Sequence, residues 1–226
     1  MRFKGALVDI DNTLYDYGKA HGKALARAVA RASETCGVPA ARVEEAYAEA
    51  RMRVNRELRD TAASHNRLLY FQGALEALGV NPMLHALDIY EAYWSTFLDS
   101  MELYDDATCF LEHIAGIKVC LVTDLTAHIQ HRKVRRLGLH RYAGYIVTSE
   151  EAGREKPHRR IFELALEKTG LTAEEVFMVG DSFGKDIQGA AGLGIRSFWV
   201  NRDGASESTG GLVTEVASLR EVIAHI

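Results

Sequence analysis

The order of apolar and polar residues divides the chain into three parts. Residues 3 to 10 form a short apolar run that is typical of a strand covered on both faces. The pattern is then helical up to about residue 103, with apolar side chains recurring every three to four residues and charged ones between them. Four helices are predicted in this block, near residues 23–35, 43–58, 68–78 and 84–98.

From about residue 105 the pattern alternates between strands and helices. Strands are predicted at residues 117–124, 145–149, 176–181 and 196–201. Helices are predicted between them, near residues 126–137, 158–169 and 184–192. Such spacing favours a parallel sheet with helices on both faces. The segment 204–211, rich in glycine and serine, is predicted to be a flexible surface loop.

The first strand precedes the helical block, whereas its natural sheet partners all follow it. The simplest arrangement is an α/β, Rossmann-like core domain built from residues 1–17 and 104–226. Residues 18–103 are then an inserted α-helical cap domain.

Composition limits the classes of partner. The 226 residues are 47% hydrophobic and carry a formal net charge of -4, which gives no basic surface for a nucleic acid polymer or an anionic membrane. No apolar run is long enough for a membrane span, and no signal peptide is recognised, so we expect a cytoplasmic protein. The three cysteines are far apart and predict neither a disulfide framework nor a zinc site.

Polar side chains follow each predicted strand of the sheet. They are Asp9 and Asp11, Thr123 and Asp124, Ser149 and Glu150, and Asp181 and Ser182. Because ligands of an open parallel sheet bind beyond the carboxyl ends of its strands, these residues are expected to converge on one crevice. A buried carboxylate without a partner is costly, so the aspartates predict a bound cation.

Four segments carry a resemblance to a known superfamily. D-I-D-N-T-L (9–14), L-V-T-D (121–124), the lysine of R-E-K-P (154–157) and V-G-D-S-F-G-K-D (179–186) resemble, in order, the four motifs of the haloacid dehalogenase-like hydrolases. The insert after the first motif resembles the subfamily with a helical type 1 cap. Residues 147–166 resemble its small-molecule phosphatases, including pyrimidine 5'-nucleotidase-like members. Asp124 stands where many relatives have asparagine, which is expected to make the pocket more acidic.

The resemblance implies an aspartyl-phosphate mechanism with Mg²⁺ as the cofactor. Asp9 would be the nucleophile, and Asp11 the general acid and base, expected to keep its proton longer because other carboxylates are near. Thr123 and Lys156 would hold the phosphate oxygens. The implied metal ligands are the Asp9 carboxylate, the backbone carbonyl of Asp11, the Asp181 carboxylate and, through a water, Asp186.

The cap gives weaker signals. Arg53, Arg56, His65 and Arg67 are candidate substrate contacts, together with Asp124 of the core; arginines around an amphipathic helix are also typical of a solvated face. Tyr15 and Tyr17 either line the pocket or pack at a hinge. The basic segment H-I-Q-H-R-K-V-R-R (128–136) is interpreted as a solvated helix face.

These features predict a Mg²⁺-dependent phosphomonoesterase for a small metabolite, namely a nucleotide, a sugar phosphate or a compound like phosphoglycolate. A sugar phosphomutase keeps all four motifs and remains an alternative. A 2-haloacid dehalogenase fits less well because of Asp11 and Asp181, and a phosphonate hydrolase because residues 24–117 contain no lysine. A non-enzymatic phosphate-binding module would leave the cap and Asp11 unexplained. The oligomeric state is open.

Overall fold

The computed structural model describes residues 3–202, 204 and 210–226. They divide into two compact units. The core unit comprises Met1–Asp16 and Glu102–Ile226, and the cap unit comprises Tyr17–Met101. Each unit is described by itself.

A six-stranded parallel sheet forms the centre of the core unit, in the order β3-β2-β1-β4-β5-β6. The strands are β1 (Gly5–Val8), β2 (Lys118–Thr123), β3 (Tyr145–Thr148), β4 (Val176–Gly180), β5 (Arg196–Val200) and β6 (Val213–Val216). The predicted parallel α/β fold is therefore confirmed. Only β6 was not predicted; it is a four-residue strand at one edge of the sheet, with three of its residues half-buried, so its sequence lacks the apolar run of the inner strands.

The first strand lies in the middle of the sheet, between β2 and β4. Val8 is in register with Leu121 on one side and with Val179 on the other. The segments that follow these three strands therefore leave the sheet at one edge and at nearly the same level, which is where the polar strand ends predicted from the sequence meet.

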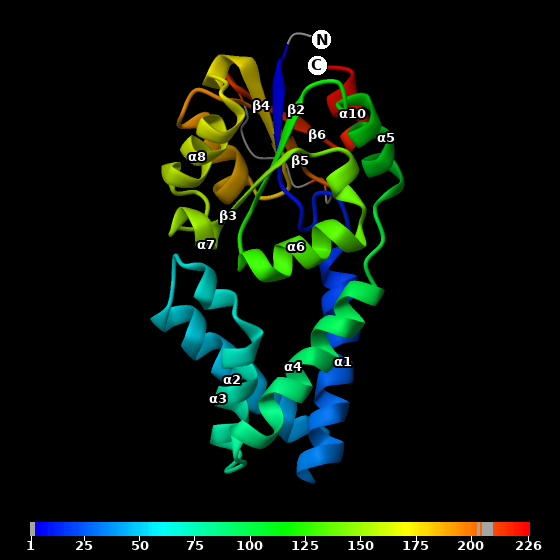
Figure 1. Cartoon of the computed structure of the whole chain (residues 1–226), viewed down its shortest axis with the longest axis vertical. Helices are drawn as coiled ribbons and strands as arrows, with labels where there is room; N and C mark the ends of the chain where they lie inside the picture. The colour runs from blue at the N-terminus through cyan, green and yellow to red at the C-terminus, as the bar shows by residue number, and fades with distance from the viewer. Residues whose placement is uncertain (1–2, 203, 205–209) are drawn as a thin grey trace. The chain divides into compact units, whose positions relative to one another are not determined.

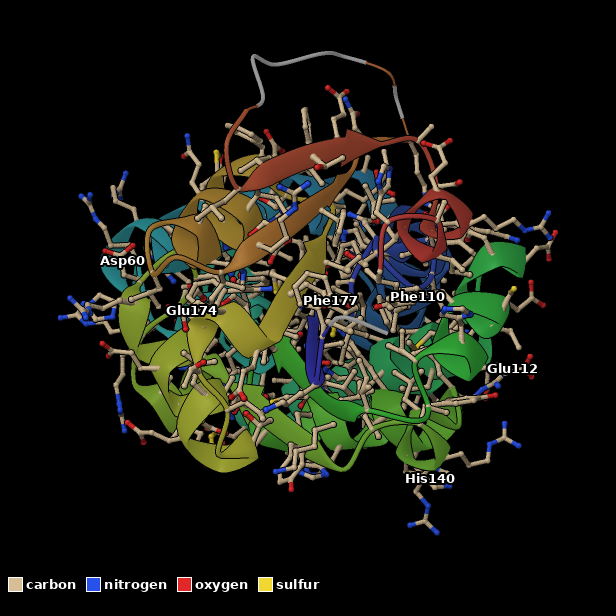
Figure 2. The ribbon with its side chains drawn as sticks, turned by 90° about the horizontal axis from the view of Figure 1, so that it is seen from above. Asp60, Phe110, Glu112, His140, Glu174 and Phe177 are labelled. Atoms are coloured by element: carbon tan, nitrogen blue, oxygen red, sulfur yellow. The ribbon has the colours of Figure 1, made fainter. Side chains whose placement is uncertain are left out.

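Helices cover both faces of the sheet. Figure 1 shows α8 (Arg159–Thr169) on one side of the sheet and α5 (Asp105–His113) and α10 (Leu219–Ile223) on the other. The α8 side buries a cluster that includes Leu7, Val122 and Phe162. Seen from above in Figure 2, Phe177 of β4 and Phe110 of α5 lie inside the core unit, where both are fully buried.

The remaining core elements are short. They are α6 (Ala127–Arg136), η2 (Leu139–Arg141), α7 (Ser149–Ala152), η3 (Ala173–Glu175), the π-helical turn η4 (Phe183–Ile187) and α9 (Gln188–Ala191). The helix predicted at 184–192 is thus a π turn followed by a short α-helix. Of the loop predicted at 204–211, residues 205–209 lie outside the described residues.

The cap unit is entirely helical. Its elements are α1 (Tyr17–Cys36), α2 (Ala40–Glu57), η1 (Ala62–His65), α3 (Arg67–Ala77) and α4 (Pro82–Asp99). Asn66 and Asn81 cap α3 and α4, each accepting a hydrogen bond of 3.0 Å from the backbone N–H two residues later. Helix α1 packs on α4, and α2 on α3. Among the described residues, none of the helices has the length and apolar character needed to cross a membrane.

Candidate active site

Three carboxylates gather at the carboxyl edge of the sheet. Asp9 follows β1, Asp181 follows β4, and Asp186 lies on the η4 turn; one oxygen from each lies within 4.8 Å of the other two. Asp9 and Asp186 are buried, and Asp181 is half-buried. A cluster of carboxylate oxygens is the donor set that a hard divalent cation such as Mg²⁺ prefers, so these residues fit a metal ion.

Lys156 places a positive charge against the three-carboxylate cluster. Its Nζ lies 2.6 Å from Asp9 Oδ1 and 2.7 Å from Asp186 Oδ1, and donates to the carbonyl of Val122 at 3.1 Å. Apart from this contact with Lys156, Asp186 Oδ1 has no hydrogen-bond partner among the described residues, so a lone pair remains for another ligand. Burial by itself lowers the pKa of Lys156, but Asp186 and Asp9 outweigh it and raise the pKa well above its usual value.

Thr13, the last polar residue of the first motif, links two of the carboxylates. Its hydroxyl lies 2.8 Å from Asp9 Oδ2 and 3.3 Å from Asp181 Oδ1, and it accepts a 3.0 Å hydrogen bond from the Asp181 backbone N–H. The side chain is fully buried. Thr13 therefore fixes the loop after β1 against the loop after β4.

Asp9 and Asp181 resist ionisation because they are buried and lie close to other carboxylates. Burial raises the pKa of Asp9 well above its usual value; Lys156 opposes this, and Asp186 and Asp181 add to it. The pKa of Asp181 is raised to about 6, first by burial and then by Asp186. A divalent cation would favour their charged forms, which supports the fit of a metal ion at this position.

Asp11 lies in different surroundings from the other three carboxylates. Lys133 Nζ of α6 lies 2.7 Å from both of its side-chain oxygens. Tyr15 donates its hydroxyl hydrogen to Oδ1, and Gln130 Nε2 lies 3.4 Å from Oδ2. Burial by itself raises the pKa of Asp11, but Lys133 more than offsets it, so the pKa is lowered.

These contacts correct two expectations. The segment 128–136 is not simply a solvated face, because Gln130 and Lys133 are fully buried. Asp11 also does not hold its proton longer than usual, since the cation at its side stabilises the ionised form. Of the two tyrosines after the first motif, Tyr15 contacts Asp11, whereas Tyr17 belongs to the cap unit.

Thr123 and Asp124 end β2 beside this cluster. The Thr123 hydroxyl accepts a 2.8 Å hydrogen bond from Gln130. Asp124 accepts from the Lys156 backbone N–H at 3.0 Å and lies 3.0 Å from Lys185 Nζ. The charge that Asp124 adds to the pocket is thus balanced by Lys185, a residue of the fourth motif to which the sequence analysis gave no role.

The candidate cap residues differ in their surroundings. Arg53 and Arg56 are exposed on α2, and His65 is half-buried at the end of η1. Arg67 is buried inside the cap unit, where it donates to the His65 carbonyl and the Tyr17 hydroxyl. Arg67 is therefore not part of a solvated helix face, and its role as a substrate contact stays a prediction.

Four residues at the core site were not predicted from the sequence: Thr13, Gln130, Lys133 and Lys185. Lys133 lies between Ile129 and Leu137 at four-residue spacing, in the position of an apolar stripe that faces the core. A lysine in such a position is a usable sign of a buried ion pair. Thr13 is part of the D-x-D-x-T motif itself.

Comparison with known proteins identifies the family of the chain. A family model described as haloacid dehalogenase-like hydrolase matches residues 3–194. A ribulose-1,5-bisphosphate 5-phosphatase of Halopiger xanaduensis is 39% identical, over 90% of this chain and 87% of its own length. A glyceraldehyde 3-phosphate phosphatase of Methanopyrus kandleri is 32% identical, over 88% and 84%. The pyrimidine 5'-nucleotidase YjjG of Escherichia coli is 31% identical, over 67% of each chain.

Solved structures share the fold. A 2-haloacid dehalogenase of Pseudomonas syringae superposes with a TM-score of 0.77 at 26% identity, covering 99% of both chains. A putative hydrolase of the same superfamily from Bacillus subtilis, whose structure was solved with bound magnesium, superposes with a TM-score of 0.72 at 22% identity, covering 100% of this chain and 99% of that one. One fold thus carries different chemistries, and the reaction has to be argued from the site residues.

Proposed function

Because the chain belongs to the haloacid dehalogenase-like hydrolases, and within them to the phosphatases that act on phosphoric monoesters, we propose that it hydrolyses a small sugar phosphate through an aspartyl-phosphate on Asp9. The observation that carries the proposal is the convergence of Asp9, Asp181 and Asp186 at the sheet edge, with Lys156 against Asp9. A carboxylate attacks a phosphate dianion only where its negative charge is offset.

In the first step, an Asp9 oxygen forms a bond to phosphorus as the ester P–O bond breaks, and the leaving oxygen takes a proton from Asp11. In the second step, water attacks the phosphorus and gives its proton to Asp11 as the Asp9–phosphate bond breaks. After the first step Asp11 is ionised, which is the form that accepts the proton from water and the form that the contact with Lys133 favours. Taking up this proton returns Asp11 to the acid form that serves the next leaving group.

Positive charge and hydrogen-bond donors hold the phosphate during both steps. Lys156 and the Thr123 hydroxyl are the proposed contacts to its oxygens. Asp9, Asp181 and Asp186, with the Asp11 carbonyl, are the proposed ligands of Mg²⁺, which when bound would offset the charge of the phosphate.

The proposed substrate class follows from the curated relatives. Two of those described above, at 39% and 32% identity, act by name on a sugar bisphosphate and on a triose phosphate, and they match more of this chain than the pyrimidine nucleotidase does. The exposed Arg53 and Arg56, together with His65 and Asp124, remain the proposed contacts to the sugar part. Alanine at Arg53 or Arg56 should change the ranking among sugar phosphates and spare a small aryl phosphate, because remote binding energy helps only substrates that reach those residues.

The test is hydrolysis of an aryl phosphate, followed by a panel of triose, pentose and nucleoside phosphates. Activity should require a divalent cation and disappear in excess chelator. Asp9→Asn should abolish both turnover and the acid-stable phosphoenzyme, while Asp105→Asn, which changes an exposed carboxylate of α5, should leave both intact. Turnover in the Asp9→Asn protein, or full activity in chelator, would show that the proposed chemistry is wrong.

The same panel, extended by a 2-haloacid, separates the alternative reactions. A phosphomutase would convert one sugar phosphate into its isomer without releasing inorganic phosphate. A dehalogenase would release halide from a 2-haloacid without a divalent cation. We expect inorganic phosphate as the product, because Asp11 and the three-carboxylate cluster suit water attack on a phosphorylated aspartate.

A further inference from the structure

Lys133 is a buried cation of the core site that lies outside the four sequence motifs. Its side chain is fully buried, and its Nζ lies 2.7 Å from each oxygen of Asp11. Burying an ammonium group is expensive unless a carboxylate compensates for the charge. The position of Lys133 therefore depends on Asp11, and the position of Asp11 depends on Lys133.

Tyr15 and Gln130 also hold the Asp11 carboxylate. Tyr15, which is fully buried, donates its hydroxyl hydrogen to Asp11 Oδ1. Gln130, one helical turn from Lys133 on α6, lies 3.4 Å from Asp11 Oδ2 and donates to Thr123 at 2.8 Å. Both oxygens of Asp11 are thus held from the α6 side, and its side chain does not belong to the metal-binding cluster of Asp9, Asp181 and Asp186.

We propose that Lys133 is a positioning residue: together with Tyr15 and Gln130 it fixes the Asp11 carboxylate for proton transfer and keeps it out of the cluster of Asp9, Asp181 and Asp186. The inference rests on the proposed function, since it gives Asp11 the proton-transfer role. The hydrogen bonds of Lys133 described above are both to Asp11, so its proposed effect passes through Asp11.

The second step of the reaction should depend most on the contacts of Lys133, Tyr15 and Gln130 to Asp11. Water is a weak nucleophile, so its attack on the Asp9 phosphate needs a base held within hydrogen-bond reach. The proton of the water passes to Asp11 as the new O–P bond forms. The first step with an activated aryl phosphate does not need a proton donor, because the phenolate leaves unaided. Loss of Lys133 should therefore leave phosphorylation of Asp9 nearly unchanged and slow its hydrolysis.

Rapid-mixing kinetics with an aryl phosphate and saturating Mg²⁺ test the proposal. In Lys133→Met, the steady-state rate should fall by roughly 10–100-fold, while the rate constant of the initial product burst stays within about threefold of wild type and KM does not rise. The ratio of burst to steady-state rate should rise accordingly. The burst amplitude gives the concentration of active sites. The steady-state rate is divided by this concentration, so inactive protein in the preparation does not change the ratio.

Two further proteins sharpen the result. Arg135→Met, which changes an exposed residue of the same helix, should behave like wild type. The double variant Lys133→Met with Asp11→Asn should be no slower than Asp11→Asn alone, because both changes disable one unit. An unchanged ratio in Lys133→Met, or losses that multiply in the double variant, would overturn the proposal.

Failure of the proposed function gives a different result. In that case the wild-type protein shows no divalent-dependent hydrolysis, or Asp9→Asn still turns over. If the wild-type protein and Asp9→Asn behave as proposed and the Lys133→Met ratio does not change, only the role of Lys133 is wrong.

Discussion

Replacing Lys156 with methionine should destabilise the metal-free core unit strongly. The change removes a buried ammonium group that lies 2.6 Å from Asp9 Oδ1 and 2.7 Å from Asp186 Oδ1. Methionine is similar in length but carries no charge. The variant therefore leaves carboxylates buried side by side without the lysine that offsets them.

The size of the effect follows from these distances. At an effective dielectric constant of about 20, each contact is worth roughly 6 kcal/mol of attraction. Much of this is offset by the cost of taking lysine and carboxylate out of water, so removal of one partner from a buried ion group costs about 3–5 kcal/mol. For a chain of this length each kcal/mol lowers the melting temperature by about 2–4 °C, which gives a loss on the order of 10 °C.

The assay is thermal and urea unfolding of wild type and variant, in chelator and in excess Mg²⁺. We expect the full loss in chelator and a smaller one in Mg²⁺, because a bound divalent cation offsets the carboxylates in place of lysine. Lys4→Met is the control; it removes an ion pair to Glu175 in which the lysine is 69% exposed, and should lower the stability far less than Lys156→Met.

Two results would refute the reasoning. A loss in chelator no larger than that of Lys4→Met would mean that Lys156 does not compensate for a buried charge cluster. An equal loss with and without Mg²⁺ would mean that lysine and metal ion do not act on the same carboxylates.

Three other predictions concern single side chains. Thr13→Val should weaken Mg²⁺ binding by roughly 10–100-fold in a titration of thermal shift, since the hydroxyl orients two carboxylates; unchanged binding would contradict this role. Burial and then Arg67 lower the pKa of His21 in the folded cap unit from 6.5 to about 4, so the unfolded chain binds a proton first as the pH falls. Stability should therefore drop between about pH 6.5 and 4, by about 1 kcal/mol after allowing for partial exposure, and His21→Gln should flatten this part of the pH profile. Arg67→Met should destabilise the cap unit by about 2–4 kcal/mol, because the Tyr17 hydroxyl and the His65 carbonyl lose their donor; unfolding followed by Trp94 fluorescence should show the loss, and its absence would count against a structural role.

The sequence predicted the parts of the site that strand topology determines. Asp9 and Asp181 follow apolar runs that can only be inner strands, and parallel strands end at one edge, so their convergence could be predicted. The alternation of strands and helices likewise sufficed for the parallel sheet. The short edge strand β6 could not be recognised because its residues are half-buried and lack an apolar run.

The partner of each buried charged side chain could not be read from the sequence. A lysine on a basic helix is usually solvated, and Lys133 is buried only because Asp11 lies opposite it in the fold. Arg67 is similar, since its partners Tyr17 and Trp94 come from two other helices of the cap unit. Which face of a helix meets a carboxylate or an aromatic ring is decided by packing between distant segments.

The central place of β1 in the sheet has a consequence for the order of folding. Gly5 pairs with Lys118 on one side and with Val176 on the other, so both neighbours of the first strand are made long after it. Contacts of such long sequence separation form slowly, because a long loop has to close before they form. The helices of the cap unit all lie within Tyr17–Met101, so their contacts require no such long loop to close. Hydrogen-exchange labelling during refolding should therefore detect protection in α1 before β1. During synthesis, the proposed nucleophile Asp9 is made some 170 residues before Asp181, so the two carboxylates can meet only after that whole segment has been made.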